Sequence, residues 1–265
     1  MKPPHVRLAV LGFVALLAGS CGGADPAPDT GASPDEAVGP ELTGELLVSA
    51  AASLTDVFAE LGAAFAAEHP EVEVVFNLGS SSGLATQLVE GAPSDVFAAA
   101  DMQPMEVVAA AGLVDDPAVF ATNRLEIVVE PGNPLGITGL ADLARDDVIL
   151  VLAGEEVPAG RYAAEVLDAA GVRADPASLE LDVRAVLGKV ATGEADVGIV
   201  YHSDVVAGGE RVEGVAIPAE ANVVAEYPIA VLETSQVPEL SAAFVEVVEG
   251  PEGRQALRAG GFGPA

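Results

Sequence analysis

A cluster of three serines between two glycines is the part of the sequence whose residue types and spacing most clearly suggest chemistry. The run GSSSG at 79–83 follows a strand-like stretch at 72–76 and precedes a helix-like stretch at 84–89. Such a turn can be an anion cradle, in which free backbone N–H groups and hydroxyls contact a bound oxyanion. It can also be a nucleophile elbow, because Gly79-x-Ser81-x-Gly83 fits G-x-S-x-G in the strand–turn–helix context that this motif requires.

Three further turns have the same arrangement, in which a strand ends and small or uncharged residues begin a helix. They lie at 51–53 (AAS), 157–160 (VPAG) and 182–183 (DV). In parallel α/β folds such turns gather at the carboxyl ends of the strands, where ligands bind. Because each helix start offers unpaired N–H groups and a partial positive charge, several together can bind an oxyanion without a cationic side chain. Taken alone, each turn is explained by ordinary capping, and Ser53 with Asp56 fits a capping-box variant.

The strands and helices expected around these turns indicate an α/β protein from residue 45 onward. Helical patterns are expected from Ser53, after the serine cluster, at 103–111, at 157–170, from Asp182, at 236–249 and at 251–259. Strand-like runs alternate with them at 46–48, 72–76, 95–100, 125–130, 148–152, 195–201, 212–217, 222–226 and 229–232. The β-rich segments near 125–130 and 222–232 are candidates for the places where the chain crosses between two lobes and returns.

The composition indicates a folded body with a strongly acidic surface. Of 265 residues, 51% are hydrophobic, 4% are aromatic and none is Trp, so the core is expected to consist mainly of Ala, Val and Leu. The 41 acidic residues outnumber the 11 basic ones, which gives a net charge of −30. This balance argues against nucleic-acid binding, because no phosphate-neutralising patch can be assembled. It also favours a surface that repels its copies, and a monomer is expected.

The first 43 residues are expected to export and anchor this body. Residues 1–20 combine basic residues with an apolar run that is too short to span a bilayer, as in a signal peptide. Cys21, the only cysteine, follows small residues as in a bacterial lipobox and is the expected lipidation site, although Ala18 replaces the usual leucine. The alternative is a secreted protein with a free thiol. Residues 21–43 predict a disordered tether, which would hold the body at the outer face of the cytoplasmic membrane, at the cell surface or in the periplasm.

Several motifs, in order, resemble those of the molybdate-binding proteins of ABC transporters, which are type II periplasmic binding proteins. The resemblance covers most of residues 45–262. It rests on AASLT at 51–55, SSSGLA at 80–85, GAPSD at 91–95 with AD at 100–101, VPAG at 157–160 with YA at 162–163, DVR at 182–184, GIVY at 198–201 with SD at 203–204, and EYP at 226–228. Gly83 and His202 stand beside ligand positions, where the occupants vary in the family.

The resemblance implies a two-lobed α/β fold with mixed, mostly parallel sheets flanked by helices and a ligand cleft between the lobes. Lobe 1 is expected to comprise 44–122 plus 228–265, and lobe 2 to comprise 123–227. The family holds its oxyanion with two serines, two main-chain N–H groups and a tyrosine hydroxyl, which fall here on Ser53, Ser81, Ala159, Val183 and Tyr201. The implied ligand is molybdate or tungstate and the implied partner is a membrane permease. No cofactor and no direct protein–metal ligand is expected.

The chemistry of these residues agrees with the resemblance. A tetrahedral dianion only accepts hydrogen bonds, and hydroxyl and N–H groups donate them. Each such bond contributes ~1.5–3 kcal/mol because the ligand is charged. Arg161 and Arg184 are expected to point out of the pocket or to pair with carboxylates, since fixed dipoles suffice. The same donors suit sulfate, whereas hydrogen phosphate would need an acceptor.

Two other classes of function stay open. A secreted serine hydrolase would use Ser81 as nucleophile, Asp95 or Asp182 as acid, and His202, the only histidine after the serine cluster. However, the nucleophile would be one of three adjacent serines and no lipase-like oxyanion motif precedes it, so no enzyme activity is expected. A purely structural or adhesive surface lipoprotein would give no response to any small ligand.

Overall fold

The computed structural model describes residues 42–265. The expected signal peptide at 1–20, the lipidation site Cys21 and all but the last two residues of the expected tether lie outside this part of the chain. Within 42–265, no helix is both long enough and apolar enough to cross a membrane.

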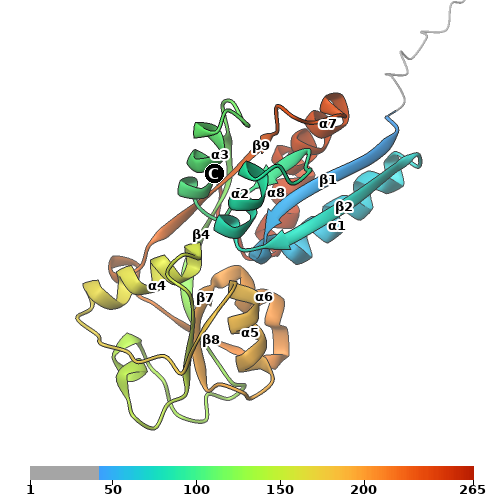
Figure 1. Cartoon of the computed structure of the whole chain (residues 1–265). Helices are drawn as coiled ribbons and strands as arrows, with labels where there is room; N and C mark the ends of the chain where they lie inside the picture. The colour runs from blue at the N-terminus through green and yellow to red at the C-terminus, as the bar shows by residue number, and fades with distance from the viewer. Residues whose placement is uncertain (1–41) are drawn as a thin grey trace, which may run out of the picture. The chain divides into compact units, whose positions relative to one another are not determined.

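The described residues form a mixed sheet whose strands follow the order β2-β1-β3-β9-β4-β7-β5-β6, with β8 paired to β4 (Figure 1). Its parallel pairs are β1 with β2 and β3, and β5 with β6 and β7. Every antiparallel pair involves β4 or β9. The strands are β1 (Gly44–Ala51), β2 (Val72–Gly79), β3 (Val96–Ala98), β4 (Ala118–Val129), β5 (Leu150–Ala153), β6 (Ser178–Glu180), β7 (Val197–Tyr201), β8 (Glu213–Ala216) and β9 (Val224–Val231).

Helices flank the two halves of this sheet, which we call lobe 1 and lobe 2 (Figure 1). Lobe 1 contains β1, β2 and β3 with α1 (Thr55–Glu68), α2 (Ser81–Val89), α3 (Met102–Ala110), α7 (Pro238–Glu249) and α8 (Pro251–Ala259). Lobe 2 contains β5, β6, β7 and β8 with α4 (Pro158–Ala169), α5 (Val183–Ala191) and α6 (His202–Gly208). Short 3-10 turns are η1 (Ala52–Leu54), η2 (Leu140–Ala144), η3 (Gly209–Arg211) and η4 (Ala219–Ala221).

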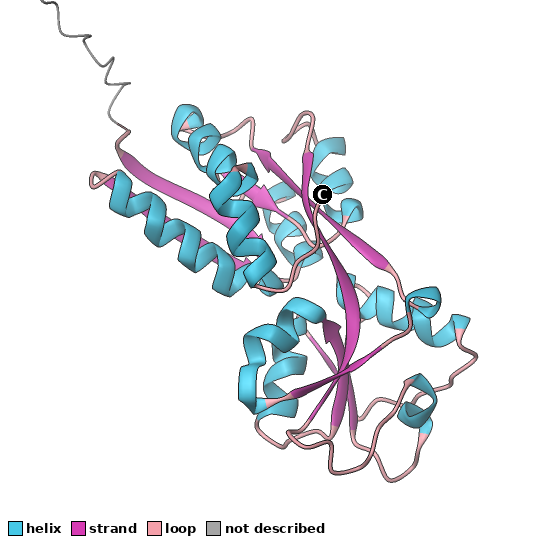
Figure 2. Cartoon of the chain, turned by 180° about the vertical axis from the view of Figure 1, so that it is seen from behind, coloured by secondary structure: helices cyan, strands magenta, loops and turns pink. Residues whose placement is uncertain are grey.

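Strand β4 carries the chain from lobe 1 to lobe 2. Its residues 118–124 pair with β9, and its residues 125–129 pair with β7 and β8. Figure 2 shows the same long strand from behind, joining the two halves. The sequence predicted a strand only from residue 125, because the polar residues Asn123 and Arg124 interrupt the apolar pattern that marks a strand. Asn123 is nevertheless buried, and its side chain contacts other buried polar groups rather than water.

Strand β9 brings the chain back, and it is one strand where the sequence predicted two. Pro228 lies in its interior, where a missing N–H would normally break the ladder. The pairing register shifts between Val119 and Ala121 of β4, opposite Pro228 and Tyr227. A bulge of this kind tolerates proline because the register shift already disrupts the ladder.

A continuous hydrophobic core joins the two lobes at the crossing strands. It contains residues of β1, α1 and α7 in lobe 1, and of β5, β7 and α5 in lobe 2. Aliphatic side chains dominate it, with Phe58 contacting Phe76, Phe120 and Phe244 through tilted or edge-on ring packing. A second cluster lies under α2 and α3. This packing holds the strands and helices of both lobes in place.

A glycine fixes the position of α4 against the end of β5. A Cβ atom at Gly160 would lie 2.0 Å from the carbonyl oxygen of Gly154 and 2.4 Å from that of Ala153. No side chain fits at such distances, so only glycine lets the first turn of α4 pack directly on the end of β5. This packing brings the N–H group of Ala159 to the carboxyl ends of the strands.

Candidate functional site

All four turns singled out in the sequence meet around one small cavity. Its lining residues are Ala51, Ala52, Ser53, Gly79, Ser80, Ser81, Ala100, Val157, Pro158, Ala159, Asp182, Val183 and Tyr201. The five predicted ligand-contacting residues are all among them, and both lobes contribute. Its volume of about 10 Å³ is far below the roughly 300–1,000 Å³ of pockets for drug-sized molecules, so only a very small ligand suits this space.

Ser81 is the first residue of α2 and is 1% exposed. Its Oγ accepts a hydrogen bond from the backbone N–H of Ala100 at 2.9 Å. A hydroxyl that accepts in this way keeps its own hydrogen free to donate. The N–H groups of the first turn of α2 also have no partner within the helix. The serine cluster therefore presents donors to the cavity.

Ser53 is not a helix cap, so the capping-box prediction is wrong. Strand β1 continues directly into the 3-10 turn η1, and α1 begins only at Thr55. The Oγ of Ser53 instead lies 2.9 Å from the Oη of Tyr227. The carboxylate that was to complete the box, Asp56, pairs with Arg184 at 2.6 Å. A guanidinium group attracts a carboxylate more strongly than a neutral N–H group does.

Ala159 and Val183 lie at the starts of two helices of lobe 2. Ala159 is the second residue of α4 and Val183 is the first residue of α5. The N–H groups of a first helical turn lack a partner within the helix, and they carry the partial positive charge of the helix dipole. In α5, the carboxylate of Asp182 accepts the N–H of Ala185 at 2.9 Å and so acts as the helix cap. The N–H of Val183 is left for a ligand.

Tyr201 ends β7 and brings a buried hydroxyl to the cavity wall. Its side chain is 1% exposed, and its Oη has no hydrogen-bond partner within residues 42–265. Burial, with a smaller effect from Tyr227, raises the pKa of the Tyr201 hydroxyl well above its usual value. The hydroxyl therefore stays protonated and can donate. Buried polar groups are almost always paired, so this hydroxyl is available to a hydrogen-bond acceptor inside the cavity.

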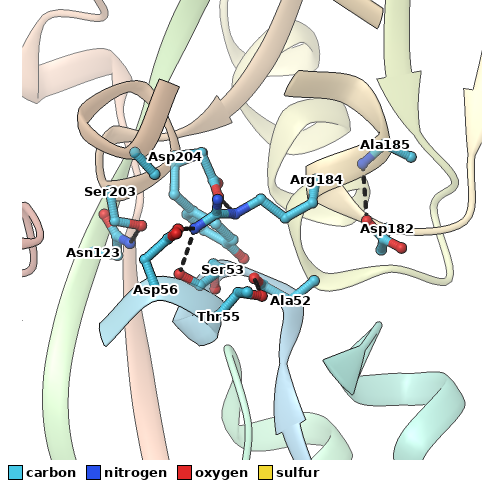
Figure 3. Close-up of polar contacts among 12 residues, drawn as sticks. Ala52, Ser53, Thr55, Asp56, Asn123, Asp182, Arg184, Ala185, Ser203 and Asp204 are labelled. Atoms are coloured by element: carbon cyan, nitrogen blue, oxygen red, sulfur yellow. Dashed lines mark hydrogen bonds and ion pairs between the residues drawn. The ribbon is translucent and has the colours of Figure 1, made fainter. Parts of the chain in front are cut away.

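Arg161 and Arg184 pair with carboxylates, as the sequence predicted, and neither lines the cavity. Arg161, in the first turn of α4, pairs with Asp101, the N-cap of α3 in lobe 1. Arg184, in the first turn of α5, contacts Asp56 of lobe 1 and, at 2.8 Å through Nε, Asp204 of its own lobe (Figure 3). Its Nη2 also donates to the carbonyl oxygen of Ser53 at 3.3 Å. Both arginines thus link the two lobes beside the cavity.

Asp204 is a functional candidate to which the sequence analysis gave no role. Its side chain is fully buried, and its Oδ2 accepts the backbone N–H of Tyr201 at 3.1 Å. Burial raises the pKa of Asp204 to about 6, against the opposing effects of the Arg184 charge and the Tyr201 N–H. Asp204 therefore fixes the end of β7, from which Tyr201 reaches the cavity. The dipeptide SD at 203–204 was part of the motif pattern, but a pattern does not indicate what a side chain contacts.

His202 does not form a hydrolase site with Ser81. Its Nδ1 lies 2.5 Å from Oε2 of Glu126, and it does not line the cavity that Ser81 lines. Of the two candidate acids, Asp95 accepts hydrogen bonds from the backbone N–H of residue 47 and the hydroxyl of residue 235. Asp182 caps α5. Among the described residues, no group of three or more His, Cys, Asp or Glu side chains could hold a metal ion.

The fold and this cavity define a class of protein. Residues 46–263 match the model of a family described as bacterial extracellular solute-binding protein, and the chain belongs to this family. One relative, the molybdate-binding protein ModA of Mycobacterium tuberculosis H37Rv, is 44% identical over 218 residues, which are 82% of this chain and 84% of the relative.

Two solved structures share the fold. One is the substrate-binding domain of a putative molybdenum ABC transporter from Clostridium difficile, with a TM-score of 0.62 and 29% identity, covering 83% of this chain and 99% of that one. The other is the sulfate-binding protein SubI of Mycobacterium tuberculosis H37Rv, with a TM-score of 0.74 and 20% identity, covering 83% of this chain and 87% of that one.

Proposed function

We propose that this protein captures molybdate outside the cytoplasm and delivers it to the membrane permease of an ABC transporter. The observation that carries the proposal is the cavity, in which three helix starts, two serine hydroxyls and the unpaired Tyr201 hydroxyl surround one small space. Such a set offers donors to a ligand that only accepts. The 44% identity to a protein named as molybdate-binding supports molybdate as the ligand.

In this proposal the ligand touches both lobes. Ser53 and Ser81 donate from lobe 1, and Tyr201 and the N–H groups of Ala159 and Val183 donate from lobe 2. Lobe 1 would comprise residues 44–122 plus 228–265, and lobe 2 would comprise 123–227. Because contacts to both lobes exist together only when the cleft is closed, ligand binding favours the closed state. At ~1.5–3 kcal/mol for each charge-assisted bond, these contacts suffice for tight binding.

The protein would act outside the cytoplasm and release its ligand chemically unchanged. Cys21 would carry a lipid anchor, residues 21–43 would tether the body outside the cytoplasmic membrane, and the protein would act as a monomer. The ligand would leave unchanged, because Ser81 is engaged as a hydrogen-bond donor and no base contacts it. An ester-hydrolysis assay that detects turnover lost in Ser81→Ala would contradict this part.

Calorimetric titration of the purified protein with four oxyanions tests the ligand directly. Molybdate and tungstate should bind at one site with micromolar or tighter affinity, sulfate should bind more weakly, and phosphate should bind most weakly of the four. Tighter binding of sulfate than of molybdate would reassign the ligand within the same oxyanion class. No response to any of the four would remove the oxyanion function.

A further inference from the structure

A chain of buried polar side chains runs from the crossing strands to the cavity. Ser53 Oγ lies 2.9 Å from Tyr227 Oη, and Asn123 Nδ2 lies 3.4 Å from the same Oη and 2.8 Å from Ser203 Oγ. Figure 3 shows Asn123 beside Ser203, with Ser53 nearby. The four residues come from η1, β9, β4 and α6, and all are at least 96% buried. Only Ser53 of these four lines the cavity.

The orientation of the Asn123 amide sets the direction of the hydrogen bonds in this row of side chains. The Oδ1 of Asn123 accepts the backbone N–H of Arg124 at 3.0 Å, which fixes which end of the amide is nitrogen. An amide nitrogen only donates, so its two hydrogens go to Ser203 and Tyr227. Tyr227 Oη therefore accepts from Asn123, and Ser53 Oγ, at 2.9 Å, is the acceptor within reach of its own hydrogen. Because Ser53 Oγ accepts that hydrogen, its own hydrogen is directed to the cavity.

We propose that Tyr227, oriented by Asn123, is a positioning residue that makes Ser53 a hydrogen-bond donor and so selects oxyanions that carry no hydrogen. The inference rests on the proposed function and adds the basis of its selectivity. A hydrogen-free dianion accepts from Ser53, whereas hydrogen phosphate carries an O–H group that needs an acceptor. When Tyr227 donates to Ser53, the hydrogen of the Ser53 hydroxyl points towards the ligand. Two donors, the Ser53 hydroxyl and the O–H group of hydrogen phosphate, then face each other without an acceptor.

The two serines of the cavity differ in what fixes their direction. Ser81 is made a donor by a backbone N–H group, that of Ala100, which no substitution other than proline removes. Ser53 is made a donor by the side chain of Tyr227. The selectivity of the cavity can therefore be changed at Ser53 without altering Ser53 itself.

Tyr227→Phe isolates the hydroxyl from the packing of the ring. The ring of Tyr227 packs edge-on against Phe262, Tyr201 and Phe120 at centroid distances of 5.3, 5.8 and 6.4 Å. Phenylalanine keeps these contacts and leaves Ser53 free to rotate. A matched control is Tyr162→Phe, which removes a phenolic hydroxyl on α4 that does not line the cavity.

The test measures dissociation constants for molybdate and phosphate at pH 8, where phosphate carries one hydrogen. Tyr227→Phe should weaken molybdate binding about tenfold, as expected when one charge-assisted hydrogen bond is weakened. It should also strengthen phosphate binding, so that the molybdate-to-phosphate preference falls further than molybdate affinity alone. Tyr162→Phe should change neither constant. A purely structural role of Tyr227 would lower the unfolding temperature and leave the preference unchanged.

A double-mutant cycle shows whether Tyr227 acts through Ser53. In a Ser53→Ala background, Tyr227→Phe should leave molybdate affinity unchanged, because the hydroxyl it orients is gone. An equal loss in both backgrounds, or an unchanged preference in Tyr227→Phe, would overturn the inference while leaving the proposed function intact. If the unaltered protein binds sulfate instead of molybdate, the cycle is run with sulfate, which is also a hydrogen-free dianion. If it binds no oxyanion at all, both proposals fail.

Discussion

The cavity wall and the arginine contacts beside it come from the same two helices but present charge differently. Ala159 and Val183 offer N–H groups at the starts of α4 and α5, and Arg161 and Arg184 follow within the same first turns. The N–H groups face a cavity, whereas both guanidinium groups are paired with carboxylates. Fixed dipoles are thus left for the ligand, and full charges are used between and within the lobes.

Here one set of groups selects the anion and another stabilises the helices that carry the donors, whereas a single arginine in the cavity would combine both tasks. A free guanidinium would attract any anion, including protonated ones, whereas oriented neutral donors discriminate by which ligand atoms accept. The paired arginines stabilise the arrangement of the helices that carry those donors. The following experiments break either the charged contacts or the neutral donors, in order of decreasing effect.

Removing Arg184 should have the largest effect, and it should be on stability. Arg184→Met leaves the fully buried carboxylate of Asp204 without its cation, which typically costs about 3–5 kcal/mol. Chemical denaturation at pH 7.5 measures this loss in the free energy of unfolding. Asp204→Asn in the same protein removes the uncompensated charge and should recover much of it. A double variant no more stable than Arg184→Met would contradict this account.

The pH dependence of stability should reveal Asp204 next. Burial raises its pKa in the folded protein to about 6, so the folded state binds this proton more readily than the unfolded chain does. The stabilising contribution is present below about pH 4 and is lost as the pH rises through about 6, with a total of at most about 3 kcal/mol. Relative to the unaltered protein, Asp204→Asn should therefore gain stability from pH 4.5 to pH 7.5. A difference that is constant with pH would show that Asp204 does not titrate in this range.

Breaking a neutral donor should affect binding more than folding. Ser81→Ala and Tyr201→Phe each remove one hydroxyl from the cavity, and each should weaken molybdate binding by about 1.5–3 kcal/mol, or roughly 10- to 150-fold. Calorimetric titration measures this loss. The unfolding temperature without ligand should hardly change for Tyr201→Phe, because its hydroxyl has no partner within residues 42–265. Unchanged affinity in both variants would remove these hydroxyls from the site.

Removing the exposed carboxylate of Asp56, one of the partners of Arg184, should have the smallest effect. The side chain of Asp56 is 64% exposed, and ion pairs with exposed partners contribute about 0–1 kcal/mol. Asp56→Asn should therefore reduce stability by less than about 1 kcal/mol and leave Asp204 paired. Because the contact joins the lobes, molybdate should dissociate slightly faster in stopped-flow measurements. A stability loss as large as that of Arg184→Met would make the exposed contact, rather than Asp204, the important partner of Arg184.

Several parts of the site could be predicted from the sequence. The four turns were predictable because each combines a β-rich run, small residues and a helical pattern, and parallel strands bring such turns to one edge. The pairing of both arginines was predictable from the chemistry of a donor-only cavity. The α/β class followed from the same alternation of strands and helices, whereas the two-lobed fold was implied by the resemblance to a known family.

The missed features depend on contacts between residues that are distant in the sequence. The local pattern with Asp56 predicts that Ser53 caps a helix, but in the folded protein Ser53 contacts Tyr227 and Asp56 pairs with Arg184. The strand was expected to begin only at residue 125, whereas Asn123 is buried and hydrogen-bonded inside β4. No local pattern indicates where a buried polar partner will lie.

A crystal structure of the protein grown with molybdate, with anomalous data collected near the molybdenum absorption edge, would locate the bound anion. One strong anomalous peak should lie inside the cavity. Its surrounding oxygens should contact the hydroxyls of Ser53, Ser81 and Tyr201 and the N–H groups of Ala159 and Val183. A molybdenum peak beside Arg161 or Arg184 with an empty cavity would contradict this prediction, because charged side chains rather than neutral donors would then bind the anion.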